Sequence, residues 1–264
     1  MNSKSLDFTL GKYEELCCAL LKSGYVPQNI TNYLRDDFAD GLGDGQKTVI
    51  LRHDIDRKLM NALRMAKLEY ALGIRSTYYF RYPHTFRPEA IRAIYDLGHE
   101  VGYHYETLSK ARGDHVKAIR LFEQELSNFR EIPGCNITTI CMHGSPLSRY
   151  DNRDLWLKYD FRDYGIFGEA YLSMAEKDVQ YFTDTGRNWG GKHSLRDMMP
   201  NQKTYESSIK TTNDLVAWIE SSVGECLYLT VHPERWAQDE REWMVCCFKD
   251  FAVNFGKNIL TMVR

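Results

Sequence analysis

The sequence predicts an α/β fold, a distorted (β/α) barrel whose strands are mostly parallel. Segments with helical periodicity alternate with short segments rich in β-branched and aromatic residues, and this alternation implies parallel strands joined by right-handed crossovers. The number of strands suits a nearly closed barrel, and no glycine-rich phosphate loop follows the first strand. The 264 residues contain no linker or repeat, so we expect one domain, residues 1–264.

The first half of the chain carries the clearest pattern. Residues 12–22 have a broad apolar stripe followed by Gly24, which suits the left-handed position that ends a helix. Residues 74–81 are rich in β-branched and aromatic side chains, as strands are. Pro88 opens a helix at a first-turn position, where its missing N–H costs little. In chain order we predict helix 12–22, strand 47–52, helix 57–72, strand 74–81, helix 88–97, strand 100–104, helix 114–131 and strand 137–142.

The second half is less regular. Short strands are predicted at 164–170 and 179–182, and a buried strand at 226–231. Thr212 is expected to cap a helix at 213–220, and a last long helix is predicted at 239–255. In a barrel of this kind, functional residues gather at the carboxyl ends of the strands.

Composition and charge exclude several classes of protein. Lys and Arg number 34 against 36 Asp and Glu, and the formal charge of -2 gives no electrostatic case for binding nucleic acid. No apolar run approaches the roughly 20 residues that a membrane span requires. The seven cysteines include no C-x-x-C pair and are expected to be core residues, and residues 1–9 lack the layout of a secretory signal. A reducing, cytoplasmic location is therefore expected.

Ionisable residues directly follow four of the predicted strands. Asp54 and Asp56 follow the first, and residues two apart on a strand point the same way, so both carboxylates are expected in one pocket. His104, His143 and His232 follow three later strands. One such residue is more often a helix cap or a turn residue. Four strand ends of the same kind indicate a divalent metal site with carboxylate and imidazole ligands.

Three stretches of residues 49–109 resemble the polysaccharide deacetylase family of metal-dependent carbohydrate esterases, in particular its divergent members that begin with His-Asp-x-Asp. They are Arg-His-Asp-Ile-Asp at 52–56, Gly-Ile-Arg-Ser-Thr-Tyr-Tyr-Phe at 73–80 and Leu-Gly-His-Glu-Val-Gly-Tyr-His at 97–104. Their order and spacing match the family. The resemblance implies a distorted α/β barrel and hydrolysis of an N-acetyl or O-acetyl group from a sugar.

Carried over to this chain, the resemblance makes Asp54 the general base and Asp56 and His104 metal ligands. It makes His232 the general acid. The family's second metal-binding histidine lies four residues after the first, where this chain has Leu108, which cannot bind a metal.

Two residues are available as the third ligand. Glu106 would share the face of the preceding histidine if the strand continued, and His143 ends the neighbouring strand; we favour His143. The family's arginine-and-proline motif on that strand is replaced by His-Gly-Ser-Pro, so the usual partner that orients the base is missing.

The expected function is therefore that of a metal-dependent hydrolase, with zinc as the expected ion and cobalt, nickel, manganese and iron left open. Two other functions stay open. One is hydrolysis of another non-peptide C–N bond, such as a cyclic amide, in the same site. The other is that of a non-catalytic carbohydrate-binding protein whose metal site has decayed. Because a cytoplasmic enzyme does not reach finished cell wall, a nucleotide- or lipid-linked sugar precursor is the expected substrate.

Two polar, tryptophan-containing stretches are candidates for binding a carbohydrate. Their residues are Asp184, Arg187, Trp189, Arg235 and Trp236. Indole faces stack on sugar rings, and Asp or Arg side chains hydrogen-bond to hydroxyl groups. The equally weighted alternative is an Asp–Arg ion pair with a tryptophan that fills the rim of the barrel.

Overall fold

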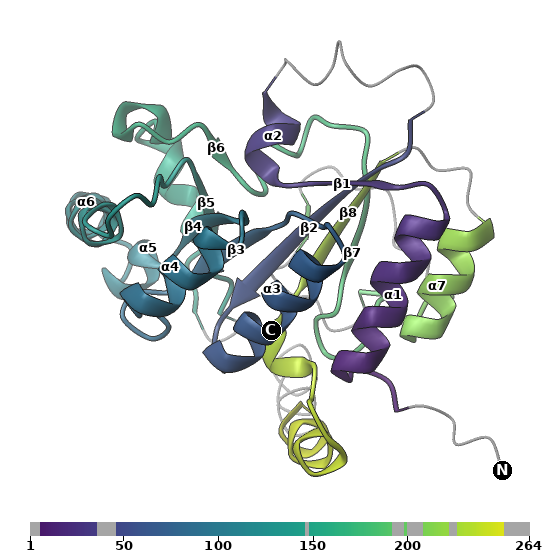
Figure 1. Ribbon diagram of the computed structural model, residues 1–264. Coiled ribbons are helices and arrows are strands. Elements are labelled where there is room, and N and C mark those ends of the chain that lie inside the picture. The colour runs from purple at the N-terminus through teal and green to yellow at the C-terminus, as the bar shows by residue number, and fades with distance from the viewer. Residues whose placement is uncertain are drawn as a thin grey trace, which may run out of the picture.

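The structure, a computed structural model, describes residues 6–35, 46–145, 148–191, 198–199, 208–221 and 226–250. Seven strands of these ranges form one parallel sheet in the order β6-β5-β4-β3-β2-β8-β7, and β1 pairs with the start of β2 (Figure 1). The strands are β1 Val26–Gln28, β2 Thr48–Ile55, β3 Thr77–Phe80, β4 Glu100–Tyr105, β5 Thr139–Met142, β6 Gly168–Glu169, β7 Gln180–Thr183 and β8 Cys226–Val231.

The sheet curls into a half-barrel, which confirms the predicted distorted (β/α) barrel. Every pairing between these strands is parallel, as the alternating pattern predicted. In the described ranges, β6 and β7 each pair with one neighbour and form the two edges of the sheet. The barrel is therefore open between them.

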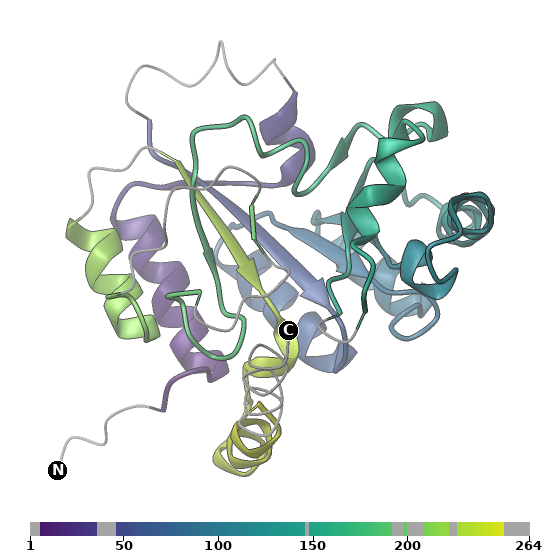
Figure 2. The same ribbon diagram turned by 180° about the vertical axis from the view of Figure 1, so that it is seen from behind.

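Helices cover the sheet, and α1 packs beside α7 (Figures 1 and 2). The helix α1 begins two residues earlier than predicted, because the Thr9 hydroxyl accepts a hydrogen bond from the backbone N–H of Lys12. The predicted cap Thr212 is instead the first residue of α7, and the Thr211 hydroxyl accepts from Asp214 N–H. The α-helices are α1 Leu10–Lys22, α2 Ile30–Leu34, α3 Leu59–Ala71, α4 Pro88–Asp96, α5 Thr107–Lys110, α6 His115–Arg130 and α7 Thr212–Ser221.

Short helical turns and one longer helix complete the description. The 3-10 turns are η2 Asn152–Leu157, η3 Phe161–Tyr164 and η4 Pro233–Arg235. Residues 240–250 are helical, and the part of the predicted helix 239–255 beyond residue 250 lies outside the described residues. Among the described residues, no helix has the length and apolar content needed to cross a membrane.

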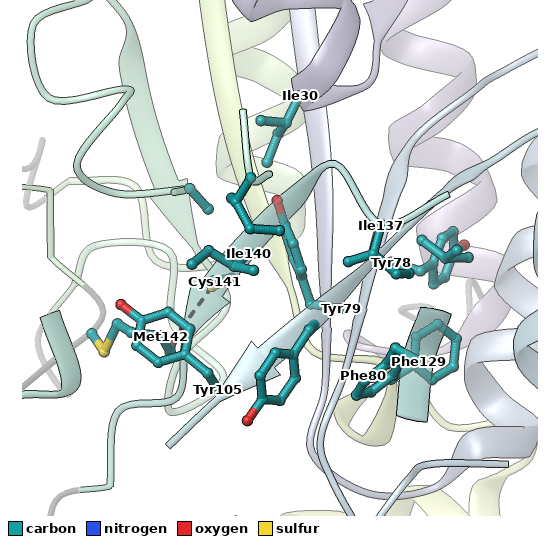
Figure 3. Close-up of a cluster of buried hydrophobic side chains, with 14 of the residues drawn as sticks. Ile30, Tyr78, Tyr79, Phe80, Tyr105, Phe129, Ile137, Ile140, Cys141 and Met142 are labelled. Carbon is teal, nitrogen blue, oxygen red and sulfur yellow. Dashed lines mark hydrogen bonds between the residues drawn. The ribbon is translucent and has the colours of Figure 1, made fainter. Parts of the chain in front are cut away.

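The core packs on both faces of β3. Tyr78 donates to Glu69 on α3, whereas Tyr79 is hydrogen-bonded to Thr139 of β5, across the inner face of the sheet. Figure 3 shows both tyrosines within the cluster of buried hydrophobic side chains. A Cβ at Gly102 on β4 would lie 2.4 Å from the ring of Tyr79, so only glycine lets this ring cross the inner face.

The strand register brings the predicted site residues together at the carboxyl ends of the strands. His53 pairs with Val231, so the residues that follow, Asp54 and His232, are neighbours across β2 and β8. His104 pairs with Cys141 across β4 and β5. All of these lie at the carboxyl ends of parallel strands, where barrel enzymes place their functional residues.

Candidate functional site

Asp54 is held by an arginine on its own strand. The Arg52 guanidinium donates two hydrogen bonds to the carboxylate, Nε to Oδ1 at 2.8 Å and Nη2 to Oδ2 at 2.5 Å. It also donates to the hydroxyls of Tyr228 and Tyr171, at 3.1 and 2.7 Å. Because residues two apart on a strand share a face, the sequence itself fixes this fork-to-fork pair. Arg52 therefore orients the carboxylate of Asp54, although the arginine-and-proline motif is missing.

The environment of Asp54 keeps its carboxylate ionised. The residue is 1% exposed, and burial alone would raise its pKa. The positive charge of Arg52 outweighs burial and, with a contribution from His104, lowers the pKa of Asp54 to about 2. At neutral pH this group is a fixed negative charge that accepts hydrogen bonds.

Three predicted metal ligands meet at one carboxylate oxygen. Asp56 Oδ1 lies 3.5 Å from His104 Nε2 and 3.4 Å from His143 Nε2. Burial acts to raise the pKa of Asp56, but the two imidazoles hold it well below its usual value, with His143 the stronger of the two. The structure thus brings together the three side chains that the strand-end argument and the resemblance selected.

The orientation of His104 suits a metal ligand. Its Nδ1 lies 3.0 Å from the backbone carbonyl oxygen of Cys141, and a carbonyl can only accept. Nδ1 therefore carries a hydrogen, and Nε2 faces the two aspartates, 3.9 Å from Asp54 Oδ2 and 3.5 Å from Asp56 Oδ1. Metal-binding histidines are commonly oriented by such a bond to the other ring nitrogen.

Glu106, the alternative third ligand, lies behind His143. Its Oε2 is 3.0 Å from His143 Nδ1 and 2.8 Å from Arg81 Nη2. Burial alone would lower the pKa of His143, but Asp56 and Glu106 raise it to about 10. A carboxylate behind a histidine is the usual support of a metal ligand, which favours His143 over Glu106. Leu108, where the family has its second histidine, is 1% exposed in the core.

A second, overlapping group of ligand-type side chains was not predicted. Donor atoms of Asp54, His104 and Cys141 all lie within 4.8 Å of one another, and this group could hold a metal ion. Cys141 Sγ is 3.9 Å from both Asp54 oxygens. His104 belongs to both groups. In this second group the Asp54 charge is already balanced by Arg52, which weakens its attraction for a cation.

The group around Asp56 offers ligand types that suit a divalent cation. Asp56 Oδ1 is buried and accepts no aligned hydrogen bond, although two imidazoles approach it at ion-pair distance. A buried carboxylate oxygen in this state is costly unless a positive charge is shared with it. One carboxylate oxygen and two imidazole nitrogens are also the ligand types that Zn²⁺ prefers in hydrolytic sites.

His232 is oriented by a buried aspartate at the end of the neighbouring strand. Asp184 Oδ1 accepts from His232 Nδ1 at 2.6 Å, and Oδ2 accepts from the His232 backbone N–H at 2.9 Å. The indole N–H of Trp236 donates to the same Oδ2 at 2.8 Å. Asp184 therefore fixes the ring of His232. The prediction that Asp184 binds a sugar hydroxyl is corrected. Its carboxylate is fully buried and accepts from three protein donors, so it has no access to substrate.

The two tryptophans are also buried, so the prediction that they stack on a sugar is contradicted. Trp189 is 0% and Trp236 1% exposed, and both pack against Phe8 of the N-terminal segment. The alternative of an ion-paired turn with a tryptophan filling the rim describes this region. Arg187 donates to the backbone carbonyl of Arg235, and both arginines lie within ion-pair distance of Asp250.

Glu234 is a site residue that the sequence argument missed. It lies on η4, it is 7% exposed, and neither of its carboxylate oxygens has a hydrogen-bond partner. Burial first, and then the negative charge of Asp56, raise its pKa to about 7. Arg57 Nη2 lies 3.7 Å from its Oε1. A third carboxyl group thus lies beside the ligand group.

One pocket borders the site, and a larger one lies apart from it. A pocket of about 470 Å³ is bordered by Asp56, Arg81 and Thr85 together with the start of α3. A larger one, of about 810 Å³, lies around residues 161–177 and shares no residue with the site. The smaller pocket is therefore the one through which a ligand would approach Asp56.

Replacement of single ligands is expected to separate the two candidate groups. Because changes behind a metal ligand alone cost 10–100-fold in affinity, Asp56→Ala and His104→Ala should each weaken Zn²⁺ binding by at least about 100-fold. Cys141→Ala should leave the dissociation constant within about threefold. His115→Ala, on the distant start of α6, is the control. Isothermal titration with Zn²⁺ measures all four variants. Loss of binding in Cys141→Ala with retention in Asp56→Ala would instead assign the ion to the second group.

Comparison with protein families and curated sequences identifies no relative of this chain. No protein-family model matches the chain, and no curated protein sequence matches it.

Proposed function

We propose that this protein is a metal-dependent hydrolase that removes an N- or O-linked acetyl group from a sugar or sugar precursor. The observation that carries the proposal is the meeting of His104 and His143 at one buried oxygen of Asp56, beside a carboxylate that Arg52 keeps ionised. The resemblance of residues 52–56, 73–80 and 97–104 to the polysaccharide deacetylase family supports the same reading.

Asp56, His104 and His143 would hold the ion. A divalent ion there, proposed to be Zn²⁺, would supply Lewis acidity that activates a water and polarises the acyl carbonyl. Asp54, fixed by Arg52, accepts the proton of the attacking water.

His232 acts at the other end of the reaction. The ring donates through Nδ1 to Asp184, so its Nε2 is the nitrogen left to hold the proton for the departing amine or alcohol. The strand register places it next to Asp54, so base and acid lie on adjacent strands. In this proposal, proton uptake by Asp54 and proton delivery by His232 are separate tasks, and each side chain is fixed by its own buried partner.

A second candidate is hydrolysis of another non-peptide C–N bond, such as that of a cyclic amide. The observation that favours it is the wall of the pocket beside Asp56, which has no aromatic side chain among its described lining residues. Carbohydrate sites commonly use an aromatic face. Trp189 and Trp236 are both buried, so neither offers a sugar an exposed indole face.

The test is acetate release from a panel of N- and O-acetylated sugars, with cyclic amides measured in parallel. Protein is purified without chelator, its metal content is measured, and activity is compared before and after EDTA and after Zn²⁺ is restored. We expect acetate release that EDTA abolishes and Zn²⁺ recovers. Turnover of the cyclic amides alone would favour the second candidate, and protein that binds no metal and turns over neither class would exclude both.

A further inference from the structure

The pocket beside Asp56 is strongly basic. It lies between the start of α3 and the loop that follows β3, and its volume of about 470 Å³ falls within the range of small-molecule sites. Its ionisable lining residues are Asp56, Arg57, Lys58, Arg81, His84 and Arg87. Four side chains with a permanent positive charge and one histidine thus face a single carboxylate.

Two of these cations are already balanced by carboxylates outside the pocket. Lys58 Nζ lies 2.7 Å from Glu242 Oε1, and Arg81 Nη2 lies 2.8 Å from Glu106 Oε2. These two side chains are therefore fixed, and they contribute little net charge to the pocket.

The other two arginines are not balanced in this way. Arg87 donates through Nη1 to the backbone carbonyls of Phe86 and Pro83, and within the described ranges it has no carboxylate at ion-pair distance. The side chain of Arg57 is 63% exposed and reaches Glu234 only at 3.7 Å. Both side chains are exposed. The pocket therefore has an excess of positive charge next to a proposed metal ligand.

The start of α3 adds to this potential. The residue before the helix, Lys58, has a left-handed backbone with φ 49 and makes no side-chain cap, so first-turn N–H groups near Leu59 lack the usual side-chain acceptor. Leu59 lines the pocket, and the N-terminal end of a helix carries a partial positive charge. Side-chain charge and helix dipole thus favour an anion at the same place.

From these contacts we propose that the pocket binds a phosphate or diphosphate group of the substrate, held mainly by Arg57 and Arg87. The inference rests on the proposed function, because it places the acyl group at Asp54 and Asp56 and the anionic substituent next to it. Arginine is suited to this task, since its planar fork binds phosphate oxygens in pairs. The substrate class is then an acetylated sugar that carries a phosphate ester or a diphosphate.

Calorimetry with two matched probes tests the site. N-acetylglucosamine 1-phosphate and N-acetylglucosamine differ only in the phosphate, and we expect the phosphorylated sugar to bind at least about tenfold more tightly. The double variant Arg57→Gln/Arg87→Gln should lose this preference. Arg92→Gln, an exposed arginine of α4 outside the pocket, should keep it. Equal binding of both probes by the wild type, or an unchanged preference in the double variant, would overturn the proposal.

Two further arms identify the source of the phosphate. UDP and geranyl diphosphate are titrated as competitors. Stronger competition by UDP assigns the site to a nucleotide-linked sugar, and stronger competition by geranyl diphosphate assigns it to a lipid-linked one. Failure of this inference is distinguishable from failure of the proposed function. Acetate release from neutral sugars with no phosphate preference removes only the anion site, whereas phosphate binding without any acetate release removes only the hydrolase.

Discussion

Replacing Asp54 with asparagine is expected to lower kcat for acetate release by about 10²–10⁴-fold while Zn²⁺ binding persists. The range is that of a positioned general base, and asparagine keeps the shape of the side chain but cannot accept a proton. Zn²⁺ binding should persist because the ion is assigned to Asp56, His104 and His143. Steady-state kinetics on the best sugar of the panel, together with metal analysis of the same sample, measure both effects.

The matched control for this variant is another buried carboxylate in an ion pair. Asp54→Asn leaves Arg52 without its counter-charge, so some loss of stability is expected, and the assay must run well below both melting temperatures. Glu69→Gln also removes a buried ion pair, but Glu69 lies on α3, against the outer face of the sheet, and this variant should retain kcat within about threefold. An Asp54→Asn enzyme that keeps more than about a tenth of wild-type kcat would remove Asp54 as the base.

Replacing Glu69 with glutamine is expected to lower the free energy of unfolding by roughly 3–5 kcal/mol at pH 7, the usual cost of breaking a buried ion pair. Glu69 is 0% exposed and lies 2.7 Å from His53 Nε2. Its second oxygen accepts from the hydroxyls of Ser76 and Tyr78, at 2.5 and 2.8 Å. Tyr13 of α1 donates to the first oxygen, so one carboxylate links two helices to the sheet.

The pH dependence of this effect follows from the pKa of Glu69. Burial would raise it, but His53 and the other donors lower it from 4.5 to about 2. A carboxyl group with a lowered pKa in the folded state stabilises the fold above its unfolded-state pKa, and the stabilisation is lost as the pH falls toward the folded-state pKa. The contribution, on the order of 3 kcal/mol, should be complete above about pH 5 and mostly gone near pH 2.

Urea unfolding of wild type and Glu69→Gln at pH 7, 5 and 3 measures this dependence. The stability difference should stay constant from pH 7 to 5 and shrink by pH 3. The matched control is Glu125→Gln, because Glu125 is buried as well but burial raises its pKa, so its difference should not shrink in this window. A difference for Glu69→Gln that is equal at pH 7 and pH 3 would show that its ionised carboxylate does not stabilise the fold.

The strand ends could be predicted from the sequence because their signals are local. The alternation of helical and strand segments predicted the parallel strands. Because the carboxyl ends of parallel strands lie at the same end of a sheet, Asp56, His104 and His143 were predicted to lie together. The pairing of Arg52 with Asp54 was also readable, since residues two apart share a face, but a strand-interior arginine attracts no attention without its partner. Cys141 was predicted only as a core residue, and its approach to Asp54 follows from the register of β4 and β5.

Other parts of the site depend on contacts between distant segments and could not be predicted. Asp184 and His232 are 48 residues apart, and their bond exists because β7 and β8 pair. The burial of Trp189 and Trp236 likewise depends on Phe8, which the chain brings over them from its beginning. No local pattern distinguishes a buried tryptophan from one that faces a ligand. For the same reason, the burial of the Glu234 carboxylate could be recognised only from the folded structure.

The Arg52–Asp54 pair has a consequence for engineering. Both members lie on one tripeptide of a single strand, so the pleat of that strand alone sets their mutual geometry. An ionised aspartate together with the arginine that orients it could thus be grafted, as the tripeptide Arg-x-Asp, onto an inward-facing strand end of an unrelated barrel. The two accompanying tyrosines would have to be supplied by the host scaffold.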